Sequence, residues 1–163
     1  MSQEEITARI RQSIMTTPAG EKEFLASDVS YQDVYAIANS LLEVLGERES
    51  AVLLCTWEKD LVAASVLAAL AGGFSLILPY AYSDSVLQEV QDTLDVKTAI
   101  TEQPAELPAF LKPVQPERGP DSSFNHALKV GPDQDFFYFF TGGSTDTPKM
   151  WPKTPRNLFS EAF

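Results

Sequence analysis

We predict an α/β fold for this sequence, with an open, largely parallel sheet and helices on both of its faces. Two short apolar runs, 51–55 and 75–78, lack the alternation of a half-exposed strand, as expected of strands covered on both sides. Segments with helical spacing follow each run, and this alternation is typical of right-handed βαβ units. A length of 163 residues suits one such domain.

Apolar residues at helical spacing predict four helices ahead of the C-terminal third. They comprise an N-terminal helix with Ile6, Ile10 and Ile14 that ends before Pro18, and helices over 31–45, 59–71 and 83–94. Ser30 and Asp33 have the spacing of a capping box, and Gly46 suits the end of the same helix. We expect Ser83 to cap the fourth helix.

A third strand is predicted over 135–140, where five aromatic residues follow an aspartate. Their position after a parallel-sheet pattern favours a place in the core over base stacking. Before this strand, five prolines recur too often for a helix or a central strand: Pro104, Pro108, Pro113, Pro116 and Pro120. We therefore expect segment 102–123 to cross the surface in extended form within a single domain that covers 1–163.

Composition argues against several classes of partner and site. Twelve basic and 23 acidic residues give a net charge of −11, which disfavours nucleic acids and anionic membrane surfaces. Residues 1–11 resemble neither a signal peptide nor an anchor, and no apolar run reaches about 18 residues, so we expect no membrane insertion and a cytoplasmic protein. The single Cys55 and single His126 exclude an internal disulfide framework and a Cys/His zinc cage, and we assign no metal ligands and no cofactor required for folding.

The polar loop after the aromatic strand is the strongest candidate site. Residues 141–149 combine glycines, hydroxyls and one lysine, Lys149, at the carboxyl end of a predicted buried strand. Glycines let backbone N–H groups converge on an anion, hydroxyls donate hydrogen bonds, and an ammonium supplies charge. Open α/β sheets bind ligands at this end of their strands. The loop therefore predicts a phosphate site, although an ordinary strand-to-helix turn has the same composition.

Three known motifs fail on this loop. The nucleotide P-loop needs a glycine before its lysine, and the dinucleotide fingerprint needs three spaced glycines; neither pattern is present. The hydrolase elbow Gly-x-Ser-x-Gly is nearly met around Ser144 in a predicted strand-to-helix setting, but Asp146 replaces its last glycine. His126 precedes Ser144, whereas the histidine of that fold follows its serine. We therefore assign no catalytic residue.

Residues 139–149 resemble the phosphate-binding signature of the AMP-forming adenylating enzymes, a superfamily that includes acyl-CoA synthetases, peptide-synthetase adenylation domains and luciferase. The usual signature is aromatic-Thr-Ser-Gly-Ser-Thr-Gly-x-Pro-Lys-Gly, against Phe-Phe-Thr-Gly-Gly-Ser-Thr-Asp-Thr-Pro-Lys in this sequence. Segments 29–34, 38–42 and 67–73 are similar to upstream family patterns and occur in the family's order. The resemblance covers nearly the whole chain apart from the proline-rich segment.

This resemblance implies a ligase that activates a carboxylic acid with ATP and Mg as an acyl-adenylate. The acceptor would be a thiol of coenzyme A or of a carrier protein. By position, the cofactor-binding residues would be Thr141, Gly142, Gly143, Ser144, Thr145 and Lys149. Their physical role would be to position and electrostatically stabilise the phosphates. The family's other active-site elements would lie beyond Phe163, so we expect the N-terminal portion of a longer enzyme, inactive by itself.

Four positions depart from the signature and its surroundings. Gly142 replaces a serine or threonine, Asp146 and Met150 replace glycines, and Pro155 stands where the family often has histidine. Asp146 adds negative charge beside the proposed phosphates. A noncatalytic α/β interaction or regulatory module with a degenerate nucleotide loop is therefore the alternative function.

Three kinds of side chain outside the loop have structural explanations that we favour. Cys55 ends a buried strand and is expected to be inert packing. His126 is expected to lie on the surface or to form a local hydrogen bond. Trp57 and Trp151 could line a pocket, but packing is the simpler expectation.

Overall fold

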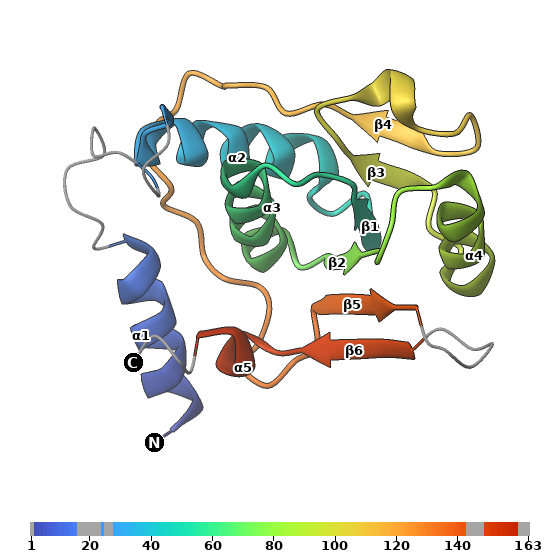
Figure 1. The fold of residues 1–163 in the computed structure, drawn as a ribbon. Coiled ribbons are helices and arrows are strands. Elements are labelled where there is room, and N and C mark those ends of the chain that lie inside the picture. The colour runs from blue at the N-terminus through green and yellow to red at the C-terminus, as the bar shows by residue number, and fades with distance from the viewer. Residues whose placement is uncertain (1, 16–23, 25–27, 143–148, 160–163) are drawn as a thin grey trace.

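The computed structural model describes residues 2–15, 24, 28–142 and 149–159. Within these ranges the helices are α1 (Gln3–Met15), α2 (Tyr31–Leu45), α3 (Lys59–Gly72), α4 (Asp84–Leu94), a 3-10 helix η1 (Pro104–Glu106) and α5 (Pro155–Phe159). The strands are β1 (Ala51–Leu54), β2 (Ser75–Leu78), β3 (Thr98–Ile100), β4 (Lys112–Val114), β5 (Phe137–Thr141) and β6 (Lys149–Lys153). Figure 1 shows their arrangement.

These strands form one open sheet in the order β4-β3-β1-β2-β5-β6. All neighbouring pairs are parallel except β5 and β6, which form an antiparallel pair. In the centre, Val52 of β1 lies opposite Leu76 of β2, and Leu76 lies opposite Phe137 of β5. The predicted α/β class with a largely parallel, open sheet is therefore confirmed.

Two apolar cores lie on opposite faces of the sheet. On one face, Val52, Leu54 and Leu76 pack with buried residues of α1, α2 and α3. On the other face, Leu53 and Ile77 pack with Leu87 and Val90 of α4 and with Leu111. Adjacent strand residues contribute to opposite cores, because successive side chains of a strand point to opposite faces. This burial on both sides explains the uninterrupted apolar runs.

The predicted start of α2 is confirmed in detail. Ser30 Oγ accepts a hydrogen bond from the Asp33 backbone N–H at 3.2 Å, and the Ser30 backbone N–H donates to Asp33 Oδ2 at 2.9 Å. At the other end, the N–H of Gly46 donates to the Leu42 carbonyl at 2.8 Å. Ser83 occupies the N-cap position of α4, but its side chain makes no hydrogen bond to the helix. It is therefore a cap by position alone.

The proline-rich segment 102–123 contains two elements that the sequence did not predict. η1 occupies its beginning, and β4 pairs in parallel with β3. β4 is an edge strand of the described sheet, where Pro113 can be accommodated because one side of the strand has no ladder partner. The rest of the segment is fastened to α2 by Asn39, whose Nδ2 donates to the carbonyls of Asp121 at 3.0 Å and Ser123 at 2.7 Å.

The setting of the candidate loop differs from the prediction. We expected a strand-to-helix turn, but the chain returns from β5 as the antiparallel strand β6, so the loop connects a β-hairpin (Figure 1). The helix that follows in the chain is the short α5, after β6. Among the helices in the described ranges, none has the length and apolar character needed to cross a membrane.

Candidate functional site

The carboxyl ends of β1, β2, β3 and β5 lie along one edge of the sheet, because these strands are all parallel. The segments that leave them begin at Cys55, Pro79, Thr101 and Gly142. Open α/β sheets bind ligands outside this edge. The described residues place two different groups of polar side chains there, one at the end of β5 and one between β1 and β3.

The first group is the base of the predicted phosphate loop. Thr141 ends β5 and lies opposite Lys149, the first residue of β6. Thr141 Oγ1 donates a hydrogen bond to the Lys149 carbonyl at 3.2 Å. The structure therefore brings together the first and last of the predicted site residues. Gly143, Ser144 and Thr145 of the same prediction, together with Asp146, lie outside the described residues.

The Lys149 side chain is exposed, and it forms no ion pair with any residue in the described ranges. Lys153, at the other end of β6, is opposite Phe137 at the amino end of β5. The two lysines therefore lie at opposite ends of the same strand. Only Lys149 lies at the edge where the parallel strands end.

Gly142 is packed against the ring of Tyr80, which follows β2. A Cβ atom added to Gly142 would lie 2.9 Å from Tyr80 Cε2 and 3.2 Å from Cδ2 and Cζ. Tyr80 OH in turn lies 3.5 Å from Glu89 Oε2 on α4. The tyrosine therefore gives a physical reason for glycine at this position, because a serine or threonine side chain would displace the ring.

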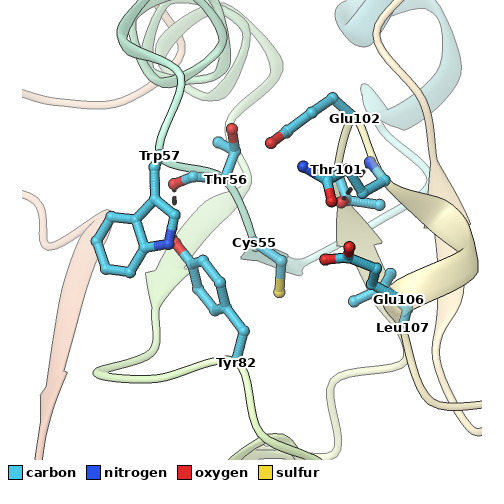
Figure 2. Close-up of a pocket in the computed structure, with 9 residues that line it drawn as sticks. Cys55, Thr56, Trp57, Tyr82, Thr101, Glu102, Glu106 and Leu107 are labelled. Atoms are coloured by element: carbon cyan, nitrogen blue, oxygen red, sulfur yellow. Dashed lines mark hydrogen bonds between the residues drawn. The ribbon is translucent and has the colours of Figure 1, made fainter.

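The second group surrounds a cavity of about 140 Å³ between the segments that follow β1 and β3 (Figure 2). The lining residues are Cys55, Thr56, Trp57, Tyr82, Thr101, Glu102, Gln103, Glu106 and Leu107. We did not predict this cavity. β3, which contains only three residues, was not predicted from the sequence. The lining residues from η1 and from the end of β3 are also far from Cys55 in the sequence, so no short motif contains both groups.

The segments that follow β1 and β3 turn in the same way. Thr56 Oγ1 accepts a hydrogen bond from the Glu58 backbone N–H, and Thr101 Oγ1 accepts one from the Gln103 backbone N–H, both at 3.0 Å. Such threonine turns commonly end a strand. A threonine directly after each of two apolar segments is the signal that could have indicated two matching turns.

An aromatic pair forms another part of the lining. Tyr82 OH donates to the Thr56 carbonyl at 2.8 Å. The rings of Trp57 and Tyr82 lie 4.9 Å apart at an interplanar angle of 40°. Trp57 is nevertheless 71% exposed. The expectation that Trp57 is packing is therefore wrong, because most of its indole surface faces solvent at the cavity.

The pKa values of two side chains in the cavity lining are raised. Burial, followed by the charge of Glu102, raises the pKa of the Cys55 thiol to about 12. Burial is also the main cause that raises the pKa of Tyr82 to about 12, with a contribution from Cys55. Cys55 therefore remains a protonated thiol at neutral pH, as expected for an inert buried cysteine.

His126 lies elsewhere and has a specific partner. Its Nε2 is 2.7 Å from Asn39 Oδ1 on α2, and its ring contacts Phe124 edge to face at 4.9 Å. The side chain is exposed, so the expected surface position is confirmed, and its hydrogen-bond partner lies 87 positions away in the sequence.

In the described part of the chain, no group of three or more His, Cys, Asp or Glu side chains could hold a metal ion.

Solved structures with the same fold were found by structural comparison. A malonyl-CoA ligase with methylmalonyl-CoA and AMP bound superposes with a TM-score of 0.70 at 20% identity, over 91% of this chain and 33% of the ligase. The adenylation domain of a keto acid-selecting nonribosomal peptide synthetase module, bound to a keto acyl adenylate, gives a TM-score of 0.64 at 15% identity, over 97% and 32%. The Klebsiella oxytoca NpsA N-terminal subdomain gives 0.64 at 16% identity, over 93% and 41%.

These likenesses show that the chain has the fold of the corresponding part of adenylate-forming enzymes, as the sequence resemblance implied. The chain spans about a third to two fifths of the length of these structures. No protein-family model matches the sequence, and no curated protein matches it by sequence. Fold, rather than sequence identity, therefore provides the connection.

Proposed function

We propose that this chain is the N-terminal, phosphate-binding part of an AMP-forming ligase. The ligase would activate a carboxylate with ATP as an acyl-adenylate and pass the acyl group to a thiol of coenzyme A or of a carrier protein. The observation that carries the proposal is the position of the Thr141–Lys149 connection. It lies at the carboxyl end of β5, in a chain whose fold matches that of adenylate-forming enzymes.

The described residues fit a phosphate in charge and position. Lys149 offers an exposed ammonium at the correct edge of the sheet. Thr141 uses its hydroxyl hydrogen on the Lys149 carbonyl and so holds the two ends of the connection together. Backbone and hydroxyl groups of Gly143, Ser144 and Thr145 would supply the remaining hydrogen bonds to ATP, and Mg would accompany the nucleotide. These groups act by positioning and by offsetting phosphate charge.

The whole enzyme would need residues that this chain does not supply. The three solved structures named above are about 2.3 to 3 times its length, judged from the share of each that is covered. We therefore expect the carboxylate pocket and the thiol acceptor site to be formed with further chain. We propose that the 163-residue chain alone catalyses no carboxylate-dependent exchange of pyrophosphate with ATP, and we place the enzyme in the cytoplasm.

A noncatalytic interaction or regulatory module is the second candidate. Tyr80 occupies the space that a hydroxyl-bearing side chain at position 142 would need. Asp146 adds a carboxylate to the same loop. A loop with one hydroxyl fewer and one negative charge more would bind a triphosphate weakly. These two features support a fold that has been retained without nucleotide binding.

Calorimetric titration with Mg-ATP, on the longest natural form of the protein, separates the two candidates. The ligase proposal expects binding by the unmodified protein, weakened about tenfold or more by Lys149→Gln because a hydrogen bond to a charged group contributes about 1.5–3 kcal/mol. Lys153→Gln is the matched control, since it removes the same charge from the opposite end of β6. It should leave the affinity unchanged within about twofold, as expected of an exposed charge away from the ligand.

The Asp146→Gly variant tests the alternative directly. Binding by this variant but not by the unmodified protein would support the noncatalytic module. Equal loss of affinity in Lys149→Gln and Lys153→Gln would contradict the assigned phosphate site, because the effect would then follow net charge and not position. Pyrophosphate exchange by the 163-residue chain alone would overturn its proposed inactivity.

A further inference from the structure

The two outermost strands of the sheet each contain a proline and at least one lysine. β4 and β6 are the edge strands of the described sheet and lie at its opposite ends (Figure 1). β4 reads Lys-Pro-Val, and β6 reads Lys-Met-Trp-Pro-Lys. An edge strand presents unpaired N–H and C=O groups, which can pair with a strand of a second molecule. The outward groups of β4 and β6 therefore decide whether two copies of this chain can join edge to edge.

The hydrogen bonds between β4 and β3 show which way Pro113 faces. The Lys112 backbone N–H donates to the Lys97 carbonyl at 2.7 Å. The Thr101 backbone N–H donates to the Val114 carbonyl at 3.1 Å. Both neighbours of Pro113 thus direct backbone groups toward β3, and the backbone of Pro113 faces away from it, because successive residues of a strand alternate in direction. This position would supply the outward N–H of β4, and proline has none.

Pro152 faces outward on β6 in the same way. The Phe136 backbone N–H donates to the Lys153 carbonyl at 3.1 Å, so Lys153 turns its backbone toward β5. The preceding residue, Pro152, then faces away from β5, as does Met150 two positions earlier. Met150 retains an outward N–H, whereas Pro152 has none. Proline therefore occupies the single outward position of β4 and one of the two on β6.

Pairing with a second copy would leave hydrogen bonds unmade. Two copies of β4 that meet antiparallel around Pro113 place proline opposite proline, so neither can donate to the other. Two copies of β6 that meet antiparallel around Trp151 place Met150 opposite Pro152, and half of the outward bonds then lack a donor. The carbonyls left over would be covered without a partner, which is unfavourable.

The lysines of β6 oppose the same pairing. Lys149 and Lys153 are exposed, and neither forms an ion pair with a residue in the described ranges. In the antiparallel arrangement, Lys149 of one copy lies opposite Lys153 of the other, and like charges directly opposite each other destabilise a strand pair. Between them, Met150 is 41% and Trp151 56% exposed. These apolar side chains would otherwise favour association at an edge strand.

We propose that Pro113, Pro152 and the two lysines of β6 close this sheet to strand addition by a second copy of the chain. The prolines remove donors that a second copy would need, and the lysines counteract the attraction of the exposed indole and thioether. This device rests on the two edge strands alone. It holds whether or not the chain belongs to a ligase.

The test is the self-association of a double variant, Pro113→Thr with Pro152→Thr, measured by sedimentation velocity over a series of concentrations. Threonine favours strands and supplies the missing N–H groups. We expect the association constant to rise about tenfold or more above that of the unmodified chain, which is about 1.4 kcal/mol and the scale of one or two net hydrogen bonds. Hydrogen exchange at the two new amides should slow as concentration increases, because association places them in a ladder.

Two further variants control this experiment. Pro120 is exposed and lies outside the strands, so Pro120→Thr should leave self-association unchanged. Lys153→Gln, added to the double variant, should raise the association constant a further twofold to fivefold or about that, because it removes the like-charge contact. The same substitution makes the net charge of −11 more negative. An increase therefore separates the contact between edge lysines from the general repulsion between acidic chains.

Three results would overturn the proposal. The first is an association constant of the double variant that equals that of the unmodified chain or of Pro120→Thr. The second is association that appears only with a lower urea midpoint, since unfolded chains and not the folded edge would then associate. The third is a fall in association on adding Lys153→Gln, which would show that net charge governs it. If the double variant fails to fold, Pro152→Thr alone decides, because all five residues of β6 are exposed.

Discussion

Two regions of opposite charge share one edge of this sheet. At the end of β5, the exposed Lys149 lies opposite Thr141, and the next residue, Gly142, packs against the ring of Tyr80. Between β1 and β3, Glu102 and Glu106 face an exposed tryptophan, and no described lining residue is basic. The topology places both at the carboxyl ends of parallel strands. The difference teaches that the sheet brings both groups of residues to one edge, while the residues after each strand decide which charge each group presents.

Replacing a residue of the strand between the two regions should have the largest effect. Leu76 lies on β2, is fully buried, and is opposite Val52 on one side and Phe137 on the other. Leu76→Ala should lower the free energy of unfolding by about 2–5 kcal/mol, because it removes buried methyl groups and leaves a cavity. Urea titration of the variant and the unmodified chain measures this difference.

Each region contains one tryptophan, which lets the same experiment test whether the regions unfold together. Trp57 lies at the cavity and Trp151 on β6. In chains that keep only one of them, with phenylalanine at the other position, fluorescence should report the same urea midpoint, as expected of a small two-state domain. Leu76→Ala should move both midpoints equally. A shift in only one reporter would show that the two regions are separate folding units.

The central elements of the fold could be predicted because their signals are local. The apolar runs at β1 and β2 and the capping box at Ser30 are each contained in a few consecutive residues, and the structure has them at the predicted positions. β3 and β4 were missed because three residues each are too few for a periodic pattern. β6 was missed because its pairing with β5 depends on a hairpin, and Pro152 argues against a strand unless it lies at an edge.

The two regions also differ in whether their sequence signal is local. The proposed phosphate site is contiguous in sequence, so its residue types alone indicated it, although only Thr141, Gly142 and Lys149 of the six named residues are described. The cavity unites Cys55, Tyr82 and Glu102 from separate segments. The pairing of β1 with both β2 and β3 brings those segments together. No single stretch of sequence carries that information.

The cavity region makes a prediction about the single cysteine. Only the thiolate reacts readily with a disulfide reagent, and burial raises the pKa of Cys55 from 9.0 to about 12. At pH 8.5 the folded chain should therefore label at least about a hundredfold more slowly than the chain in urea, since each unit of pKa changes the thiolate fraction about tenfold. The rate should rise as pH increases toward 12. Because the chain has one cysteine, absorbance of the released reagent measures this site alone.

Two further results would test this explanation of the slow labelling of Cys55. Glu102→Gln removes the second cause of the raised pKa, so it should speed labelling modestly, while burial keeps the rate far below that in urea. Labelling of the folded chain as fast as that of the unfolded chain would contradict the burial of the Cys55 thiol.

The smallest predicted effect concerns Gly142, at the other end of the shared edge. Gly142→Ala should lower the free energy of unfolding by about 1 kcal/mol, because the new methyl group would force the ring of Tyr80 to move. In a chain that already carries Tyr80→Ala, the same substitution should be neutral or slightly stabilising, since alanine restricts the unfolded chain more than glycine does. Urea titration of the four chains gives a coupling of about 1 kcal/mol between the two positions. An equal cost in both backgrounds would show that backbone conformation, and not the tyrosine, requires glycine beside the proposed phosphate site.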